Sequence, residues 1–322
     1  MHSPHSPHSA PILLAGTIGI DTIITPTTRA ERVLGGSASF AAAAARLFVE
    51  KIDVLSVIGE DFPTEYWDDL NGKDINLDYV DRVPGPSFAW TGQYEVNMNR
   101  RKTVAANDHV MLNWGVKVPE PLRKHPVIAV TCMVPERQLE FISQCESPRL
   151  IISDSMDKWI SRQPEWLDKV IARSHVTMMN EDEAKGYAST GSIVEAGEYL
   201  LSKGAKYAII KQGEYGSTLF SRTEEGSLSI FRCPAWPLKA VIDPTGAGDS
   251  FLGAMAGYLA TLPSLSPGFD EMKTAVVLGT IAASFTCESF SADSLFSMDE
   301  SKFRTRLEEF LNMVRIPSTP DF

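Results

Sequence analysis

The chain has few cysteines, fewer basic than acidic residues, and no long apolar run. Its four cysteines among 322 residues show neither CxxC nor Cys/His spacing, which disfavours a disulfide scaffold or a structural zinc site and favours free thiols in a reducing cytoplasm. Lys and Arg number 30 against 41 Asp and Glu, and the net charge of −11 argues against nucleic acid as the main partner. No apolar stretch is long enough to cross a membrane, and no apolar signal segment begins the chain, so we expect a cytoplasmic protein without a membrane partner.

Two nucleotide-binding motifs are also missing. No G-x-x-x-x-G-K-[ST] sequence occurs, which excludes a Walker A loop. Gly246 and Gly248 begin a G-x-G-x-x-G pattern, but Phe251 stands where the third glycine is required. That fingerprint also usually opens a βαβ domain, whereas here it would close one. A dinucleotide-dependent dehydrogenase is therefore disfavoured.

Short apolar runs alternate with helical patterns along most of the chain. With 43% hydrophobic residues, the chain can bury a large core. This order predicts an α/β fold of three layers, in which a mostly parallel central sheet carries helices on both faces. Polar residues or glycines follow most of the predicted strands. In open α/β sheets, ligands bind at the edge formed by the carboxyl ends of the strands. The predicted core strands are 12–15, 53–58, 127–130, 150–152, 176–179 and 207–211.

A more polar segment interrupts this pattern. Between Phe88 and Val104, aromatic and apolar residues alternate with others, as in a half-exposed strand. We expect a small separate sheet built from residues 20–34 and 86–112, which would serve as a lid over a cleft, a homodimer face, or both. One domain spanning residues 11–316 with this lid is more economical than two domains. Residues 1–10, rich in His, Ser and Pro, are predicted to be a disordered tail.

The stretch Asp243–Phe251 carries the strongest functional signal. The apolar run Ala240–Ile242 predicts a strand before it, and the apolar spacing after it predicts a helix. Gly246 and Gly248 let the backbone approach a ligand closely, and a helix N-terminus offers free N–H groups to an anion, most often a phosphate. A carboxylate in such a turn, Asp249, is explained if it takes a proton from an attacking hydroxyl. A plain helix cap is the alternative.

Five motifs together resemble the ribokinase-like (PfkB) carbohydrate kinases. They occur in the family's order and span nearly the whole chain, from about Leu13 to Phe296. One glycine motif is a weak signal, but five in order are a specific one. The five are Gly35-Gly36-Ser37-Ala38, Gly59-Glu60-Asp61-Phe62, Asn180-Glu181-Asp182-Glu183, Lys211-Gln212-Gly213-Glu214-Tyr215-Gly216, and Asp243-Pro244-Thr245-Gly246-Ala247-Gly248-Asp249 followed by Gly253-Ala254.

The resemblance implies a ribokinase-like fold and a kinase that uses ATP and Mg²⁺. Asp249 would be the general base, and the backbone N–H groups of Gly246, Ala247 and Gly248 would form an anion hole for the γ-phosphoryl group. The other roles follow from position in the motifs: Asp21, Gly35 and Gly36 would hold acceptor hydroxyls; Asn180 and Glu183 would place Mg²⁺ and the phosphates through water; Lys211, Gly213 and Gly216 would border the nucleotide; and Asp243 and Thr245 would hold a monovalent cation such as K⁺.

Several candidate residues have structural alternatives. Asn180 and Glu183 fit a capping box by themselves, and Asp21 fits a surface turn. Asp154, which ends a core strand, is as compatible with a helix cap as with the phosphate region. The pair Arg100–Arg101 in the predicted lid could face an anionic substrate, but solvated charges are commoner at a hairpin tip.

The chain departs from ribokinases at two positions on the acceptor side. Phe40 stands where the Gly-Gly motif of ribokinases continues to a sugar-binding Asn, and the segment Thr131–Pro135 holds no acidic residue where ribokinases have one. We therefore predict phosphorylation of a sugar or sugar-like alcohol, with ribose itself not favoured. A nucleoside kinase on the same fold, with Phe40 and the aromatic lid stacking on the base, is one alternative. A non-catalytic sugar- or nucleotide-binding homologue is another.

Overall fold

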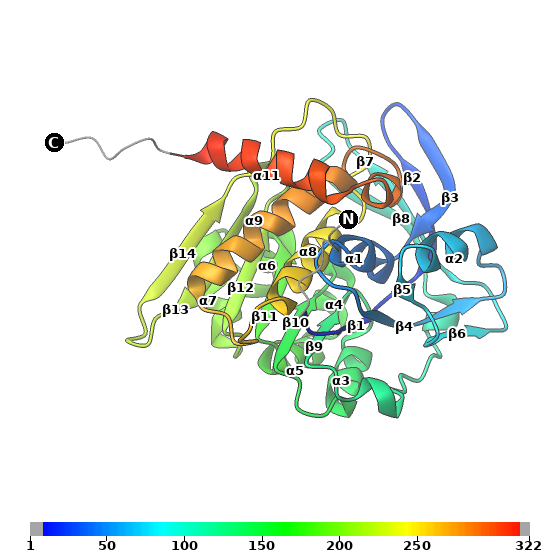
Figure 1. Cartoon of the computed structure of the whole chain (residues 1–322), viewed down its shortest axis with the longest axis horizontal. Coiled ribbons are helices and arrows are strands. Elements are labelled where there is room, and N and C mark those ends of the chain that lie inside the picture. Colours follow the sequence, from blue (N-terminus) through cyan, green and yellow to red (C-terminus); the bar gives the residue numbers. More distant parts are fainter. Residues whose placement is uncertain (1–8, 316–322) are drawn as a thin grey trace.

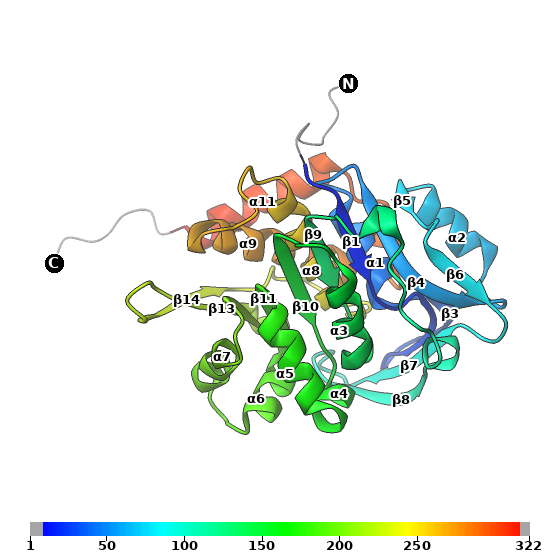
Figure 2. The same cartoon turned by 90° about the horizontal axis from the view of Figure 1, so that it is seen from below.

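A large twisted sheet runs through the molecule (Figures 1 and 2). The computed structural model describes residues 9–315. Across these residues the sheet has ten strands in the order β14-β13-β12-β11-β10-β9-β1-β4-β5, with β6 also paired to β4. All neighbours are parallel except β12–β13 and β13–β14. The strands are β1 (Ile12–Ala15), β4 (Ile52–Gly59), β5 (Ile75–Asn76), β6 (Val80–Val83), β9 (Val127–Val130), β10 (Leu150–Asp154), β11 (Val176–Asn180), β12 (Tyr207–Lys211), β13 (Ser217–Arg222) and β14 (Leu228–Cys233).

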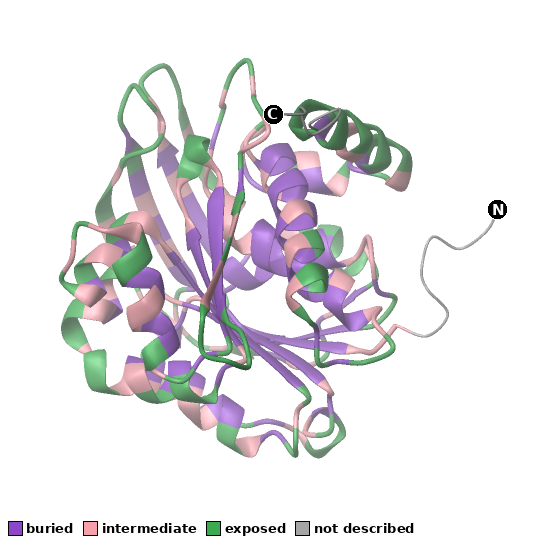
Figure 3. Ribbon diagram, turned by 90° about the vertical axis from the view of Figure 1, so that its left-hand side faces the viewer, coloured by how far each residue is buried: buried purple, intermediate pink, exposed green. Residues whose placement is uncertain are grey.

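Helices cover both faces of this sheet, which confirms the predicted three layers. Central strands such as β1 and β9 are buried along their whole length (Figure 3), because each face meets a helical layer. One face packs against α1 (Ser37–Ala45), α8 (Ala247–Ala260) and α9 (Phe269–Thr286), and the other against α3 (Pro135–Gln144), α5 (Pro164–Arg173), α6 (Glu181–Ala188) and α7 (Ile193–Ser202). The remaining helices are α2 (Thr64–Asn71), α4 (Asp157–Arg162), α10 (Asp293–Phe296) and α11 (Glu300–Val314), with short 3-10 turns η1 (His109–Met111), η2 (Glu120–Leu122) and η3 (Gly213–Tyr215).

The alanine-rich helix α1 packs closely against α8. Every residue of α1 is buried, and a Cβ on Gly253 of α8 would lie 2.0 Å from the carbonyl oxygen of Ala41. Small residues on both helices therefore allow backbone-to-backbone contact. We call this contact the α1–α8 seam.

The predicted small sheet is present. Its strand order is β3-β2-β7-β8, built from β2 (Gly19–Ile24), β3 (Arg29–Gly35), β7 (Phe88–Tyr94) and β8 (Arg101–Asn107). It lies at one end of the molecule, beside α1 and the β4 side of the large sheet (Figures 1 and 2).

Three sequence expectations change. Ala240–Ile242 is not a strand: it follows six residues without helix or strand, and the Ile242 N–H instead donates to the Cys287 carbonyl at 2.8 Å. The hairpin β13–β14, which turns at Gly226, is not among the predicted elements, because neither strand alternates regularly between polar and apolar residues. Of the predicted tail 1–10, residues 1–8 lie outside the described residues, and Ala10 is held to the fold by a 2.8 Å bond from its N–H to the Ala260 carbonyl.

Between residues 9 and 315, every helix is too short or too polar to cross a bilayer.

Arg46 at the end of α1 ties this helix to the segment that contains α10. Its guanidinium donates to the carbonyl oxygens of Leu295 (2.8 Å), Phe296 (3.3 Å) and Met298 (2.8 Å). We expect Arg46→Met to lower the free energy of unfolding by about 2–4 kcal/mol in urea titrations, since partly buried carbonyls lose a charged donor. Arg304→Met, which removes a 70%-exposed partner of Glu300, should cost under ~0.5 kcal/mol. Equal losses would contradict the role given to Arg46.

Candidate active site

Polar side chains gather where the parallel strands end. Asp154, Asn180 and Lys211 are the last residues of three neighbouring strands, β10, β11 and β12, and Asn180 pairs directly with Lys211 in the sheet register. The N-terminal turn of α8 contributes Asp249 to the same cluster. The charges of Asp154 and Lys211 accordingly affect the pKa of Asp249. The structure thus brings together candidates from distant parts of the sequence.

The turn before α8 has the conformation expected of an anion site. Gly246 adopts φ 78°, and a Cβ there would lie 2.3 Å from the Phe40 ring, so glycine is required on both counts. Within residues 9–315, the N–H groups of Gly246 and Gly248 donate to no protein acceptor, while the Ala247 N–H makes a 3.2 Å turn bond to the Pro244 carbonyl. Two backbone donors at a helix N-terminus are therefore left without a protein partner, as an anion site requires.

Phe40 does not have the role suggested for it. Its side chain is 2% exposed and belongs to the core, directly beneath Gly246. It supports the glycine turn and is unavailable to stack on a base, so that part of the nucleoside interpretation is wrong. The side chain is buried because α1 faces α8 at this position.

Asp249 has the electrostatic properties of a base. Burial raises the pKa of its carboxyl from 3.8 to about 7, and the Asp154 carboxylate raises it further, while Lys211 and Arg101 lower it. A carboxylate that titrates near neutrality can accept a proton and release it again.

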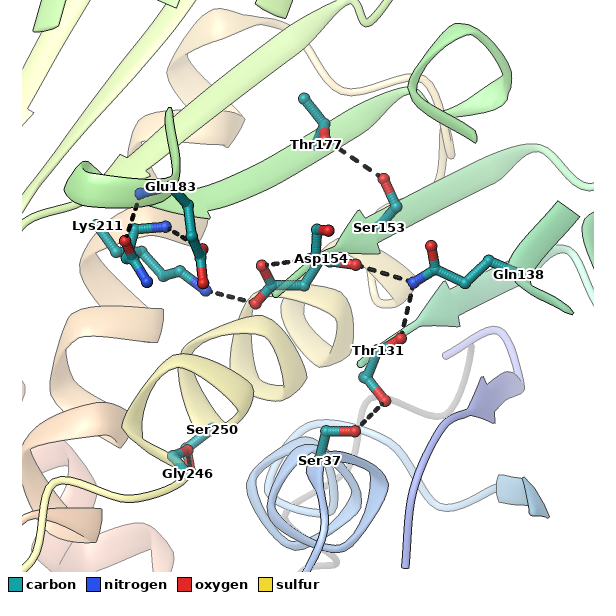
Figure 4. A network of polar contacts seen from close by, with 12 residues as sticks. Ser37, Thr131, Gln138, Ser153, Asp154, Thr177, Glu183, Lys211, Gly246 and Ser250 are labelled. Carbon is teal, nitrogen blue, oxygen red and sulfur yellow. Dashed lines mark hydrogen bonds and ion pairs between the residues drawn. The ribbon is translucent and has the colours of Figure 1, made fainter. Parts of the chain in front are cut away.

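Lys211 pairs with Asp154 and lies against the α8 turn. Figure 4 shows Lys211 and Glu183 pointing toward Asp154, with Gly246 on the adjoining turn. A Cβ on Gly248 would lie 3.0 Å from the lysine Nζ. The ammonium therefore lies beside the free backbone N–H groups.

Asn180 and Glu183 form a reciprocal capping box, as the structural alternative predicted. The Asn180 side chain accepts from the Glu183 N–H at 2.8 Å, and Glu183 Oε2 accepts from the Asn180 N–H at 2.8 Å. Glu183 is 6% exposed; burial and then Asp154 raise its pKa to about 7, against the effect of Lys211. In the described part of the chain, no three His, Cys, Asp or Glu side chains are grouped to chelate a metal, so these residues could reach Mg²⁺ only through water or phosphate oxygens.

Asp243 and Thr245 connect the anion turn to the small sheet. Asp243 Oδ1 accepts from the Thr245 N–H at 2.8 Å, and the Thr245 hydroxyl lies 2.9 Å from the Tyr94 hydroxyl of β7. Asp243 Oδ2 is buried without a hydrogen-bond partner, and burial raises the pKa of this carboxyl to about 6. An unpaired buried carboxylate oxygen is a suitable ligand for a cation.

Asp21 lies on β2, beside the glycine pair that begins α1. It is 4% exposed, and its Oδ1 has no hydrogen-bond partner. A Cβ on Gly35 would lie 2.1 Å from its Oδ2, and Gly36 adopts φ 91°. Burial raises the Asp21 pKa to about 7; nearby N–H groups of Trp90 and Gly36 lower it, and Asp243 raises it. Asp21 is therefore an unsatisfied acceptor in the site, and not a surface turn residue.

The predicted nucleotide-side turn contacts the tip of the small sheet. Gly213 (φ 56°) and Gly216 (φ 89°) flank η3, and a Cβ on Gly216 would lie 2.0 Å from the Cys233 carbonyl oxygen. The Asn99 amide at the β7–β8 tip donates to Glu214 Oε1 at 2.5 Å. The small sheet therefore spans the site from Asp21 to this turn.

Arg101 on β8 is not among the predicted site residues, but its side chain faces the site. The guanidinium lies 5.3 Å from the Trp90 ring centre and donates to the Thr103 hydroxyl at 3.2 Å. Its charge lowers the pKa of both Asp249 and Glu183. The sequence could not reveal this, because the direction of the side chain depends on how the small sheet docks.

An apolar pocket lies between the small sheet and the loops after β9 and β10. Its volume is about 30 Å³, so a flat ring would enter only if the small sheet moved outward. The pocket begins at Cys132, whose thiol has its pKa raised by burial and by Asp249. Its lining is mostly aromatic and sulfur-containing: Thr17, Phe88, Ala106, Asp108, Met111, Trp114, Cys132, Met133, Val134, Arg137, Met156, Lys158 and Trp159.

Known proteins resemble this chain in sequence and in fold. The sequence pattern of the pfkB family of carbohydrate kinases matches residues 20–298. A cytidine kinase of Thermococcus kodakarensis is 28% identical over 77% of this chain and 88% of its own length. The nucleoside kinase of Methanocaldococcus jannaschii superposes with a TM-score of 0.74 at 19% identity, covering 94% of this chain and 99% of its own. Arabidopsis thaliana ribokinase, complexed with ribose and ATP, superposes with a TM-score of 0.73 at 17% identity, covering 93% and 99%.

Proposed function

Because the chain belongs to the pfkB family of carbohydrate kinases, and is therefore a phosphotransferase with an alcohol group as acceptor, we propose that it transfers the γ-phosphoryl group of ATP to a hydroxyl of a nucleoside. The observation that carries the nucleoside is the aromatic and apolar pocket lined in part by Cys132, a residue whose pKa the charge of Asp249 raises. A free sugar presents hydroxyls on every side, whereas a nucleoside presents a flat ring that suits such walls. The similarity to a cytidine kinase supports the same acceptor.

In the proposed reaction, Asp249 takes the proton of the attacking hydroxyl. Asp21, with one unpaired oxygen, accepts hydrogen bonds from other hydroxyls of the sugar and so orients it. The free N–H groups of Gly246 and Gly248 receive the γ-phosphoryl oxygens. The turn that contains Gly213 and Gly216 would border the nucleotide, and the ATP bound in the A. thaliana ribokinase supports ATP as the donor.

Two cations belong to the proposal. The unpaired Asp243 Oδ2 and the Thr245 segment fit a monovalent cation such as K⁺. Glu183 Oε1, which makes no capping bond, and Asn180 fit a water-mediated contact to Mg²⁺ held by the phosphates. Bound there, the cations would offset phosphate charge in a site rich in carboxylates.

The small sheet is proposed to act as a lid. Its contacts at Tyr94–Thr245 and Asn99–Glu214 close it over both halves of the site, which would exclude water as a competing acceptor. Exposed Val96 (87%) and Val104 (52%) on this sheet support the predicted homodimer, which light scattering would measure.

A screen of ADP release tests the acceptor. With ATP and Mg²⁺, we expect cytidine, uridine, adenosine or inosine to give kcat/KM at least ~10-fold above ribose, since a buried ring adds about 1.5–3 kcal/mol of binding. Turnover of ribose alone would overturn the nucleoside, and no turnover with any sugar or nucleoside would overturn the kinase.

Narrowing the pocket gives an independent check. Ala106→Phe fills it from β8 and should raise the nucleoside KM at least ~10-fold, while leaving any ribose turnover within about twofold. Ala105→Phe is the matched control, because the neighbouring residue points to the opposite side of the strand and does not line the pocket. Equal effects of both variants would contradict a ring in this pocket.

A further inference from the structure

Lys211 holds a positive charge beside the N-terminus of α8. Its side chain is 17% exposed, and its Nζ lies beside Gly248 in the first turn of α8. The N-terminus of a helix carries the positive end of the helix dipole, which repels a cation. Burial also lowers the pKa of Lys211, but Asp154 and Glu183 outweigh burial, so the pKa is raised and the side chain remains an ammonium. These carboxylates therefore keep a positive charge beside the N-terminus of α8, where an anionic ligand would meet it.

Asp154 is held in place independently of the lysine. Its Oδ1 accepts from the Ser155 N–H at 2.9 Å, and the fully buried Gln138 donates to the carbonyl oxygens of Asp154 and Thr131, each at 2.9 Å. Figure 4 shows this connection running from Thr131 through Gln138 to Asp154 and Lys211. The carboxylate is therefore a fixed support for the ammonium.

We propose that Lys211 is a catalytic residue whose Nζ contacts the transferred phosphoryl group, and that Asp154 is a positioning residue that holds Lys211 against the anion hole. The proposal rests on the proposed kinase function and goes beyond a lysine that borders the nucleotide. The ammonium lies against Gly248, in the same turn as the two N–H groups that have no protein acceptor, and such a set of donors recognises a phosphoryl group better than either kind alone.

The step balances without a further reactant. The acceptor hydroxyl gives its proton to the Asp249 carboxylate while its oxygen forms a bond to the γ-phosphorus. The bond from that phosphorus to the bridging oxygen breaks, and its electron pair leaves on the β-phosphate of ADP. Lys211 keeps its proton throughout and donates hydrogen bonds to the phosphoryl oxygens.

Kinetics of charge-removing variants test the proposal. Lys211→Met should lower kcat by ~10²–10³-fold with the acceptor KM changed less than about threefold, because the contact forms mainly in the transition state. Lys211→Arg should recover at least ~10-fold of this loss. Lys185→Met is the matched control: this lysine pairs with Glu181 at 2.5 Å on α6, and its loss should change kcat less than about twofold. A Lys211→Met enzyme with kcat within about threefold of the wild type would overturn the proposal.

The pH profile separates the two residues. Lys211 lowers the pKa of Asp249, whereas Asp154 raises it. The acid limb of kcat/KM should therefore move to higher pH in Lys211→Met and to lower pH in Asp154→Asn, and Asp154→Asn should also lower kcat at least ~10-fold. Shifts in the same direction, or an Asp154→Asn enzyme with an unchanged profile and kcat, would overturn the positioning role.

A binding measurement that needs no acceptor distinguishes failure of this proposal from failure of the proposed function. Calorimetry would compare ADP with ADP plus aluminium fluoride, a planar mimic of the transferred phosphoryl group. The wild type should bind the fluoride complex at least ~10-fold more tightly than ADP, and Lys211→Met should lose that preference while keeping its affinity for ADP. If the wild type phosphorylates no acceptor, the proposed kinase function is wrong. The calorimetric comparison of the wild type with Lys211→Met still tests whether Lys211 contacts the phosphoryl group.

Discussion

We expect Asp249→Asn to lower kcat by ~10²–10⁴-fold, which is the usual contribution of a correctly placed general base. The amide keeps the shape of the side chain but cannot accept the proton of the hydroxyl. Since the carboxyl is partly buried with its pKa raised to about 7, the variant also removes an unfavourable charge and should not melt below the wild type. Steady-state ADP release and a thermal melt at pH 7.5 measure both effects.

Asp270→Asn is the control for Asp249→Asn. This residue lies on the surface of α9, where its 89%-exposed carboxylate pairs with Lys273, and its change should leave kcat within about twofold. An Asp249→Asn enzyme within about fivefold of the wild type would remove Asp249 from the mechanism and leave it as an acidic residue in the first turn of α8.

The same pKa predicts the pH dependence of the wild type. Below pH 7 the Asp249 carboxyl is increasingly protonated and cannot act as a base, so kcat/KM should fall on the acid side with a midpoint near pH 7. A midpoint near pH 4, where an ordinary Asp titrates, would contradict a buried base.

Asp21→Asn should also have a large effect, and on the acceptor alone. The variant loses a charged acceptor for sugar hydroxyls, each such bond being worth about 1.5–3 kcal/mol, so kcat/KM for the acceptor should fall ~10²-fold. The KM for ATP should change less than about threefold.

Stability gives Asp21→Asn a second signature. The folded pKa of Asp21 is about 7, raised from 3.8, so the stability of the wild type is complete below pH 4 and is partly lost as the pH rises through 7. Asp21→Asn removes this loss, and its Tm should exceed that of the wild type at pH 8 by at least ~2 °C, with a smaller gain at pH 5. A lower Tm at pH 8 would show that the charge is satisfied in the free protein.

Asp53→Asn is the opposing control. Asp53 is equally buried but pairs with His125 Nε2 at 2.7 Å and Asn76 at 2.6 Å, away from the site. Although burial raises the pKa of Asp53, these partners outweigh it and the pKa is lowered. Stability from this group is therefore present above pH 4 and lost below it, so Asp53→Asn should melt lower than the wild type at pH 8 and leave acceptor kinetics unchanged.

Sequence reasoning worked best where a local pattern has one structural solution. Asp243–Asp249 forms the turn before a helix because Gly246 needs a positive φ and close approach to Phe40. Asn180 and Glu183 are spaced for a cap, and the cap is present. The three layers could be predicted because the core strands are apolar along their whole length, which requires a helical layer on each face of the sheet.

The contacts that the sequence did not reveal depend on how strands pair in the large sheet and on where the small sheet lies against it. Lys211 reaches Asp154 across the intervening strand β11, and nothing local to either residue indicates the pair. Arg101, the acceptor pocket and the Asn99–Glu214 contact all require the position of the small sheet over the large one. The motif alone suggests a place for Phe40 on the acceptor side. The packing of α1 on α8 instead buries its side chain beneath Gly246, and no local pattern indicates that packing.

The α1–α8 seam has a consequence for how such an enzyme can change. Bulk at Gly253 is excluded by the Ala41 backbone, and bulk at Gly246 by Phe40, so the half of the site proposed to bind phosphate tolerates almost no substitution at these positions. The pocket proposed for the acceptor is instead lined by separate side chains from the small sheet, from α3 and α4, and from the loops around them. Among these residues, Thr17 bonds to Ser37 at the start of α1. Substrate preference can therefore diverge or be engineered residue by residue while the phosphate half stays intact, and a library restricted to the pocket walls should yield folded variants at a much higher rate than one directed at the seam.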